Sequence, residues 1–257
     1  MLNYMKSEWY RVFHEKSIYT FNGTCAAMIL LLNIGNGIMR QVEENFPYGT
    51  THFSFSILLG SENMLLFLAM LLGYIVFGEE YKHKTLKNSI SFGLSRQKIF
   101  LGKVLVGVGV SFLSMAFLVL IYGGSGYLLL EVSEDLGIRE LLIGLGAALP
   151  SALAGLILGI SLSFLIENST VMSIVACVIL AGVPIACKFL GLQFEFFARI
   201  GNWMPFNFLS QGQVALSKYI PIWSTGEGLT KCILAGVIGI IVFYGIGNFL
   251  FRKREIH

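Results

Sequence analysis

The residues that could do chemistry lie mainly in one charged segment, Glu79 to Lys103, of an otherwise apolar sequence. The adjacent acids Glu79 and Glu80 could serve an intramembrane enzyme, but metal-dependent chemistry there needs histidine or carboxylate ligands inside the spans. The four histidines lie outside the long charge-free stretches, and no HExxH motif occurs. Gly102 and Lys103 form no phosphate-binding loop, because valine follows them and no glycine precedes them at the required distance. We therefore expect no catalytic residue and no metal ligand, and keep an intramembrane enzyme only as an alternative.

Polar side chains within or beside the charge-free stretches form a second candidate group. Ion-coupled carriers usually place ionisable residues near the bilayer midplane, whereas these polar residues are mostly uncharged. The sequence therefore does not favour an ion-coupled secondary carrier, which we keep as the other alternative. Asn33 and Asn36, one turn apart, could line a path or form hydrogen bonds between packed helices. Glu62 could be an interfacial residue or line a cavity. The candidate substrate pathway comprises Asn33, Asn36, Glu62, Trp203 and Phe206.

The elements that must position these residues are membrane-spanning helices. Of the 257 residues, 55% are hydrophobic and only 13% are charged, with a mean hydropathy of +0.74, whereas soluble domains carry about 25% charged residues. A helix needs roughly 20 apolar residues to cross a bilayer, and backbone groups in hydrocarbon must pair internally. We predict an all-α fold, a single polytopic six-transmembrane-helix bundle over residues 1–257. Its spans are expected at about 18–39, 62–78, 104–130, 141–166, 168–187 and 232–251.

Three features refine this bundle. The second span is short, and we expect it to need either Glu62 near one interface or extra residues from Phe53–Gly60 to complete it. Glycines such as Gly155 and Gly159 should allow close helix contacts. The outer segment 188–231 is rich in aromatic residues, which predicts short interfacial helices before the last span, because tryptophan and tyrosine prefer the membrane interface.

The distribution of lysine and arginine predicts the orientation. Twelve of the eighteen basic residues fall before the first span, between spans two and three, or after the last span. By the positive-inside rule, both termini are cytoplasmic in a multi-pass plasma-membrane protein. Residues 1–17 are predicted to form an amphipathic elbow helix on the cytoplasmic leaflet, the alternative being a charged tail. Its apolar face would consist of Leu2, Met5, Trp9, Val12 and Phe13.

The charged segment 79–98 predicts a separate cytoplasmic helix. Acids oppose the dipole at a helix C-terminus and glycine often ends a helix, so we expect span two to stop at Gly78 and a new helix to begin at Glu79. A modest apolar stripe would run along this helix through Leu86 and Ile90. Ser95 should cap the helix that enters span three. Such a stripe favours docking of a soluble partner, while a simple positive-inside anchor is the alternative.

The segment also resembles the permease subunits of type-2 ABC transporters (the ABC-2 family). The matching residues are Glu79-Glu80, Thr85-Leu86, Ser89, Gly93-Leu94-Ser95-Arg96 and Gly102-Lys103. One departure is His83-Lys84, where that family often has a glycine. The resemblance implies a cytoplasmic coupling helix that seats in an ATP-binding-cassette ATPase subunit. The implied docking residues are Glu79, Glu80, Lys82, Thr85, Leu86, Ser89, Ile90 and Arg96.

The resemblance further implies an ATP-driven exporter that contains a second permease copy or a homologous permease. ATP and magnesium would be bound by the ATPase chain and no cofactor by this one. Membrane lipid is the expected surrounding, and nucleic acid is not an expected partner. The uncharged spans and the aromatic outer segment suit a peptide antibiotic or lipid-like cargo, as in bacterial self-protection.

Overall fold

The computed structural model describes residues 2–43, 46–83, 94–133, 136–209, 213–215 and 218–253. Within these ranges five helical segments are long and apolar enough to cross a membrane, and a sixth, α3 with α4, passes as a pair bent by 68°. Counting this pair as one span gives the six predicted. The five are α2 (Lys16–Val42), α6 (Arg96–Leu129), α7 (Ile138–Leu165), the joined run α8 (Ser169–Cys177), η1 (Val178–Gly182) and α9 (Val183–Leu190), and α12 (Gly226–Lys253).

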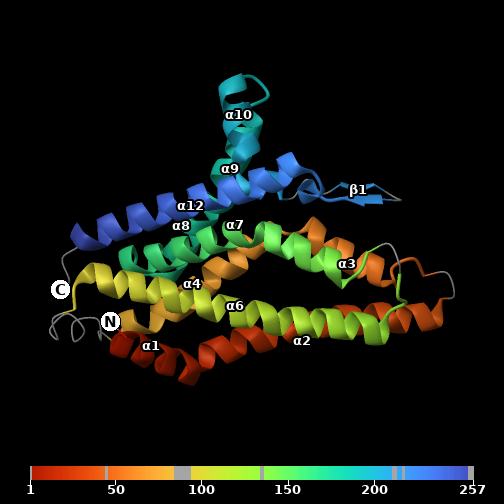
Figure 1. Cartoon of the computed structure of the whole chain (residues 1–257), viewed down its shortest axis with the longest axis horizontal. Helices are drawn as coiled ribbons and strands as arrows, with labels where there is room; N and C mark the ends of the chain where they lie inside the picture. The colour runs from red at the N-terminus through yellow and green to blue at the C-terminus, as the bar shows by residue number, and fades with distance from the viewer. Residues whose placement is uncertain are drawn as a thin grey trace.

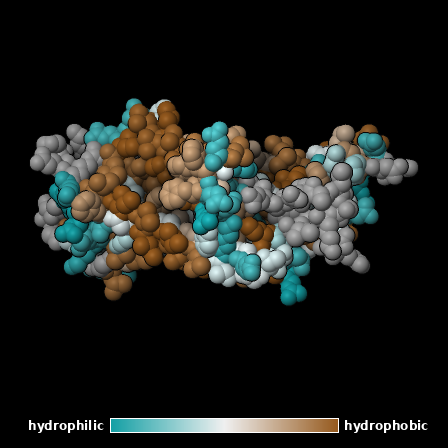
Figure 2. Space-filling view, turned by 90° about the horizontal axis from the view of Figure 1, so that it is seen from above, coloured by the Kyte–Doolittle hydropathy of each residue, from teal (hydrophilic) through white to brown (hydrophobic). Residues whose placement is uncertain are grey.

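The long helices lie side by side, with the first turn of α6 and the last turn of α12 at the end of the bundle where α1 begins (Figure 1). The prediction of an all-α fold is confirmed. The one strand pairing among named elements of the described chain is a short antiparallel hairpin, β1 (Gln213–Ala215) and β2 (Lys218–Ile220). Figure 2 shows apolar residues over much of this face of the bundle, with hydrophilic residues at both ends and in a band across the middle. This is the surface of a multi-pass membrane protein.

The core of the bundle is built around α7. In its most apolar window 61% of residues are buried, against 17% for α2 and for α12. Helix α7 packs between α4 and α12, and the predicted close contact at Gly155 is confirmed, because a Cβ there would lie 2.5 Å from the Leu66 carbonyl oxygen. On the other side, a Cβ on Gly236 of α12 would lie 2.6 Å from the backbone nitrogen of Ser151. Small residues therefore fix the two tightest interfaces.

The residues before Gly60 form a separate helix that joins the short second span in a bent pair, as in one of the two expected arrangements. Helix α3 (Thr51–Gly60) is capped at its N-terminus by Thr50, whose hydroxyl accepts a hydrogen bond from the Phe53 nitrogen at 3.2 Å. After the bend, α4 (Met64–His83) carries the chain to the other end of the bundle. The bend places Glu62 between two half-helices.

The predicted end of span two at Gly78 is wrong. Helix α4 continues without a break through Glu79 and Glu80 to His83. An interior glycine costs a helix only about 1 kcal/mol, and an acid near its C-terminus about 0.3–1 kcal/mol. Each further residue in a continuing helix adds a backbone hydrogen bond without a new nucleation step, which outweighs these penalties. Residues 84–93, where the rest of the coupling helix was predicted, lie outside the described ranges.

Helix α1 (Leu2–His14) forms where the elbow was predicted, and Glu15 separates it from α2 with φ −87° and ψ 122°. It packs along the first turns of α6: the Tyr4 ring lies against Gly102 and the Trp9 ring against Gly109. The contacts advance in the same order along both helices, so α1 and α6 run in the same direction. The position of α1 relative to a leaflet stays a prediction.

The predicted helices of the outer segment are present, although their arrangement was not foreseen. Helix α10 (Glu195–Trp203) folds back on α9, and both project from the bundle (Figure 1). Helix α11 (Pro205–Phe208), the β1–β2 hairpin and the 3-10 turn η2 (Ile222–Ser224) then return the chain to α12. The close contact of the two projecting helices depends on Gly191 and Gly201, which lie against Ala198 and Cys187 respectively.

Candidate functional site

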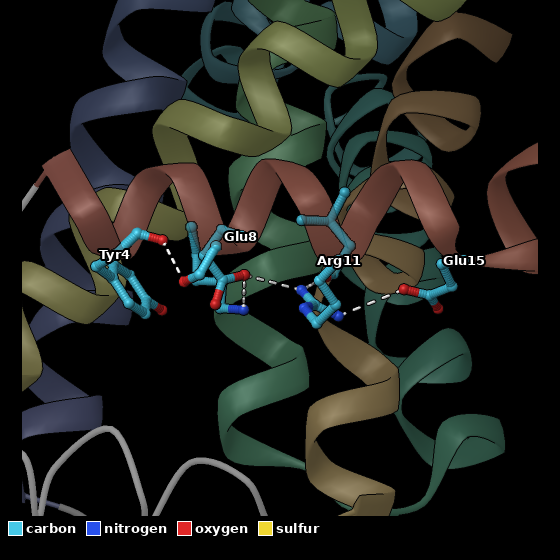
Figure 3. Close-up of polar contacts among 7 residues, drawn as sticks. Tyr4, Glu8, Arg11 and Glu15 are labelled. Atoms are coloured by element: carbon cyan, nitrogen blue, oxygen red, sulfur yellow. Dashed lines mark hydrogen bonds and ion pairs between the residues drawn. The ribbon is translucent and has the colours of Figure 1, made fainter.

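A cluster of charged side chains holds α1 against the bundle (Figure 3). We call Glu8, Arg11, Glu15 and Lys103 the elbow cluster. Glu8 Oε2 accepts hydrogen bonds from Lys103 Nζ and, at 3.0 Å, from Arg11 Nη2. Arg11 Nη1 donates to Glu15 Oε2 at 3.4 Å. Two basic and two acidic side chains therefore form one chain of ion pairs between α1, α6 and the α1–α2 junction.

Burial makes this pairing obligatory. The side chain of Lys103 is fully buried and that of Glu8 is 5% exposed. A charge removed from water is costly unless it is paired and hydrogen-bonded. The Lys103 ammonium also lies 5.3 Å from the centroid of the Phe77 ring, a favourable cation–π contact. Lys103 therefore anchors α1, and its side chain presents no positive charge at the surface.

The cluster also contacts α4. Arg11 Nη2 donates a hydrogen bond to the Val76 carbonyl oxygen at 2.6 Å, two turns before the end of α4 at His83. Together with the contact to Lys103 on α6, this gives α1 charged contacts to both helices that border residues 84–93. The predicted docking segment is therefore flanked on each side by a helix bound to the elbow.

The predicted docking residues are only partly described. Glu79, Glu80 and Lys82 lie in the last turns of α4, whose side chains are outside the described part, as are Thr85, Leu86, Ser89 and Ile90. Ser95 caps α6 as predicted, accepting a hydrogen bond from the Lys98 nitrogen at 3.4 Å. Arg96 donates from Nη1 to the Arg252 carbonyl oxygen at 2.9 Å and to that of Phe251 at 3.4 Å. It therefore joins the first turn of α6 to the last turn of α12.

Asn33 lies in a buried network between helices. Its Nδ2 donates to Ser125 Oγ at 2.7 Å, and its Oδ1 accepts from Ser54 Oγ at 3.0 Å. Ser54 Oγ also lies 2.9 Å from the Tyr122 hydroxyl. These bonds join α2, α3 and α6, and they give Asn33 a packing role. Asn36 is half-buried one turn later on α2.

The remaining pathway candidates lie elsewhere. Glu62 is 1% exposed, and its Oε1 accepts a hydrogen bond from Trp223 Nε1 at 3.1 Å. Phe206 packs edge-on against Phe67, with ring centroids 6.0 Å apart, and Trp203 is half exposed near the end of α10. The structure therefore distributes the five candidates over separate contacts. Their shared role in a substrate path stays a prediction.

Comparison with known families decides the class of protein. The family described as ABC-2 family transporter protein matches residues 16–247. The chain belongs to the ABC-2 transporter family. Among curated proteins and among solved structures, no significant match was found. The chain is thus a permease subunit of an ABC transporter, which confirms the resemblance read from the segment after span two.

Two features of the permease were missed from sequence. Glu8 attracted no interpretation, although Met5, Glu8, Val12 and Glu15 follow one another at spacings of three and four and so share a helical face. An acid on the face that must be buried predicts a basic partner, and this signal was available. The partnership of Glu62 with Trp223 had no such signal, because 161 residues separate them. Helix α1 also precedes the matched range, so its role is argued from contacts alone.

Proposed function

We propose that this permease is the membrane subunit of an ATP-driven exporter whose ATP and magnesium are bound by a separate ATPase chain. Membership of the ABC-2 family implies an ABC ATPase partner, and the sequence carries no phosphate-binding loop of its own. We assign no cofactor to this chain. Family membership also favours transport over an intramembrane enzyme or an ion-coupled carrier.

The coupling step would begin at residues 79–91. The ATPase seats there and, on closing with nucleotide, pushes on the ends of α4 and α6. The observation that carries this proposal is the elbow cluster, because it bonds α1 to α6 through Lys103 and to α4 through the Val76 carbonyl. Glu15 extends the same chain of bonds to the start of α2. Displacement of the docking segment would therefore move α1 and α2 together with α4 and α6.

The permease would work as a pair, with a second copy or a homologue, and the path would open between them toward the outer aromatic segment. The projecting α9–α10 hairpin supports an apolar path, since Leu192 is 81% and Phe196 is 68% exposed. An amphipathic cargo such as a peptide antibiotic or a lipid-like compound fits these surfaces, and self-protection of a bacterial cell is the corresponding role. Both termini would face the cytoplasm, because basic residues gather at their end.

The test is co-purification of the permease with the ATPase encoded beside it. Leu86→Asp or Glu80→Lys should abolish co-purification and transport while leaving the melting temperature of the isolated permease unchanged. Arg139→Glu is the matched control, because Arg139 is exposed in the first turn of α7 at the opposite end of the bundle. Arg96→Glu is less informative, because Arg96 also holds α12.

One result would contradict the docking assignment. If both variants still bind the ATPase and sustain transport, the segment 79–91 does not dock it. Loss of ATPase binding in Arg139→Glu as well would show that charge reversal itself, and not its place, causes the defect.

A further inference from the structure

An apolar groove of about 290 Å³ lies between α1, α2 and α6. The walls include Phe13 from α1, Tyr19 and Gly23 from α2, and Val110 and Phe117 from α6. The groove exists because the chain turns at Glu15 and because no atom lies within 4 Å of a Cβ built on Gly23. From Val110 to Phe117 it extends over two turns of α6, roughly 10 Å. This elongated shape fits a hydrocarbon chain.

Most polar groups of the groove are paired within the protein, and one of them, the Asn22 Oδ1 atom, is buried and accepts no hydrogen bond from the described residues. Asn22 Nδ2 donates to Ser114 Oγ at 3.1 Å and to the Ile18 carbonyl oxygen at 3.0 Å. The Tyr19 hydroxyl donates to the Phe13 carbonyl oxygen at 2.7 Å, which folds its ring over the α1–α2 junction. The surface left for an occupant is therefore almost wholly hydrocarbon, and it faces outward from two spanning helices.

The charge at the junction end of the groove is positive. Lys16, the first residue of α2, is exposed, and no ion pair to it occurs among the side chains that the structure describes. The nearby acid Glu15 is 11% exposed and turned toward Arg11. An amphiphile whose tail fills the groove would place its head beside Lys16, and an anionic head is favoured there.

We propose that the groove binds one acyl chain of an anionic phospholipid from the leaflet at the α1 end, with the phosphate beside Lys16. Such a lipid braces Phe13 of the elbow against α6 and so belongs to the same part of the molecule as the elbow cluster. The positive charge of Lys16 at one end of the groove favours an anionic lipid over the apolar face of a second copy of the chain. The lipid site does not depend on the proposed exporter function.

The experiment is photolabelling of the full-length permease in phosphatidylcholine vesicles that contain a few mole per cent of probe. The probe is phosphatidylglycerol with a diazirine on one acyl chain, and the comparison is phosphatidylcholine with the same chain. Labelled peptides, mapped by mass spectrometry, should come from α2 near Gly23 and from α6 near Val110. One lysine facing the lipid head should make labelling by phosphatidylglycerol about fivefold stronger, and Lys16→Gln should remove that preference.

Gly23→Leu should abolish labelling by filling the groove. Gly35→Leu is the matched control, since Gly35 lies on the same helix and also has no atom within 4 Å of a Cβ position. Equal labelling of the two variants, or labels mapped elsewhere, would overturn the site. Equal labelling by the two probes would overturn the choice of an anionic lipid. The assay needs no nucleotide, ATPase or cargo, so failure of the exporter proposal would leave its outcome unchanged.

Discussion

Removing the buried carboxylate of the elbow cluster should destabilise the permease strongly. Breaking a buried ion pair by deleting one partner costs about 3–5 kcal/mol. In Glu8→Leu the fully buried Lys103 loses this carboxylate, and the cation–π contact with Phe77, already present in the wild type, adds nothing to offset the loss. Arg11 loses its 3.0 Å partner in the same step. We therefore expect a loss of about 3 kcal/mol or more.

Lys103→Met should cost less. Glu8 then keeps the Arg11 guanidinium at 3.0 Å, so its charge stays compensated. The double variant Glu8→Leu/Lys103→Met should be more stable than Glu8→Leu alone, because an apolar pair of similar volume often replaces a buried ion pair without loss. The single and double variants thus form a cycle with an expected coupling of about 2 kcal/mol, in the upper part of the range for contacting residues.

Thermal unfolding of the purified permease in detergent, followed by tryptophan fluorescence, measures this cycle. For a chain of this size 1 kcal/mol shifts Tm by about 2–4 °C, so Glu8→Leu should unfold at least about 6 °C below wild type. Lys6→Met and Lys98→Met, both exposed on the same two helices, should shift Tm by no more than about 2 °C. If Glu8→Leu matches these controls, or if the double variant loses the sum of both single losses, the ion pair does not hold α1.

Three further outcomes test the packing. Gly155→Leu should cost about 1–3 kcal/mol in detergent unfolding, since a Cβ there meets a carbonyl of α4 at 2.5 Å, whereas Gly146→Leu on the same helix has open space and should be neutral. Trp223→Phe should lower the free energy of unfolding by about 1–3 kcal/mol, because the buried Glu62 carboxyl group loses its hydrogen-bond donor. Adding Glu62→Gln should restore part of this stability. If it restores none, the loss comes from the packing of the Trp223 ring. Asn33→Leu should cost about 0.6–1.7 kcal/mol, the average and the maximum found for one interhelical hydrogen bond in a membrane protein. A neutral result would show that its network is dispensable.

The sequence was sufficient wherever one local pattern decides the outcome. Charge-free stretches located the five helices that are long and apolar enough to cross a membrane and the α4 part of the bent pair, because hydrocarbon accepts nothing but internally bonded helices. A serine before a basic turn located the α6 cap at Ser95. The end of α4 was misplaced because Gly78 and Glu79 are only weak stop signals. The partner of Glu62 was out of reach, since a hydrogen bond between residues 161 positions apart depends on tertiary packing.

The elbow cluster shows how a charge count can mislead in a membrane protein. Lys103 was counted among the twelve basic residues whose distribution orients the chain. Burial reverses that reading, because a lysine with no exposed surface cannot interact with lipid heads and must be neutralised inside the protein. The neutralising acid is supplied by α1, which precedes the range matched by the family. If the cluster transmits the ATPase movement, the double variant Glu8→Leu/Lys103→Met should uncouple ATP hydrolysis from transport while residues 79–91 still bind the ATPase. Loss of docking would not separate ATPase binding from transport in this way.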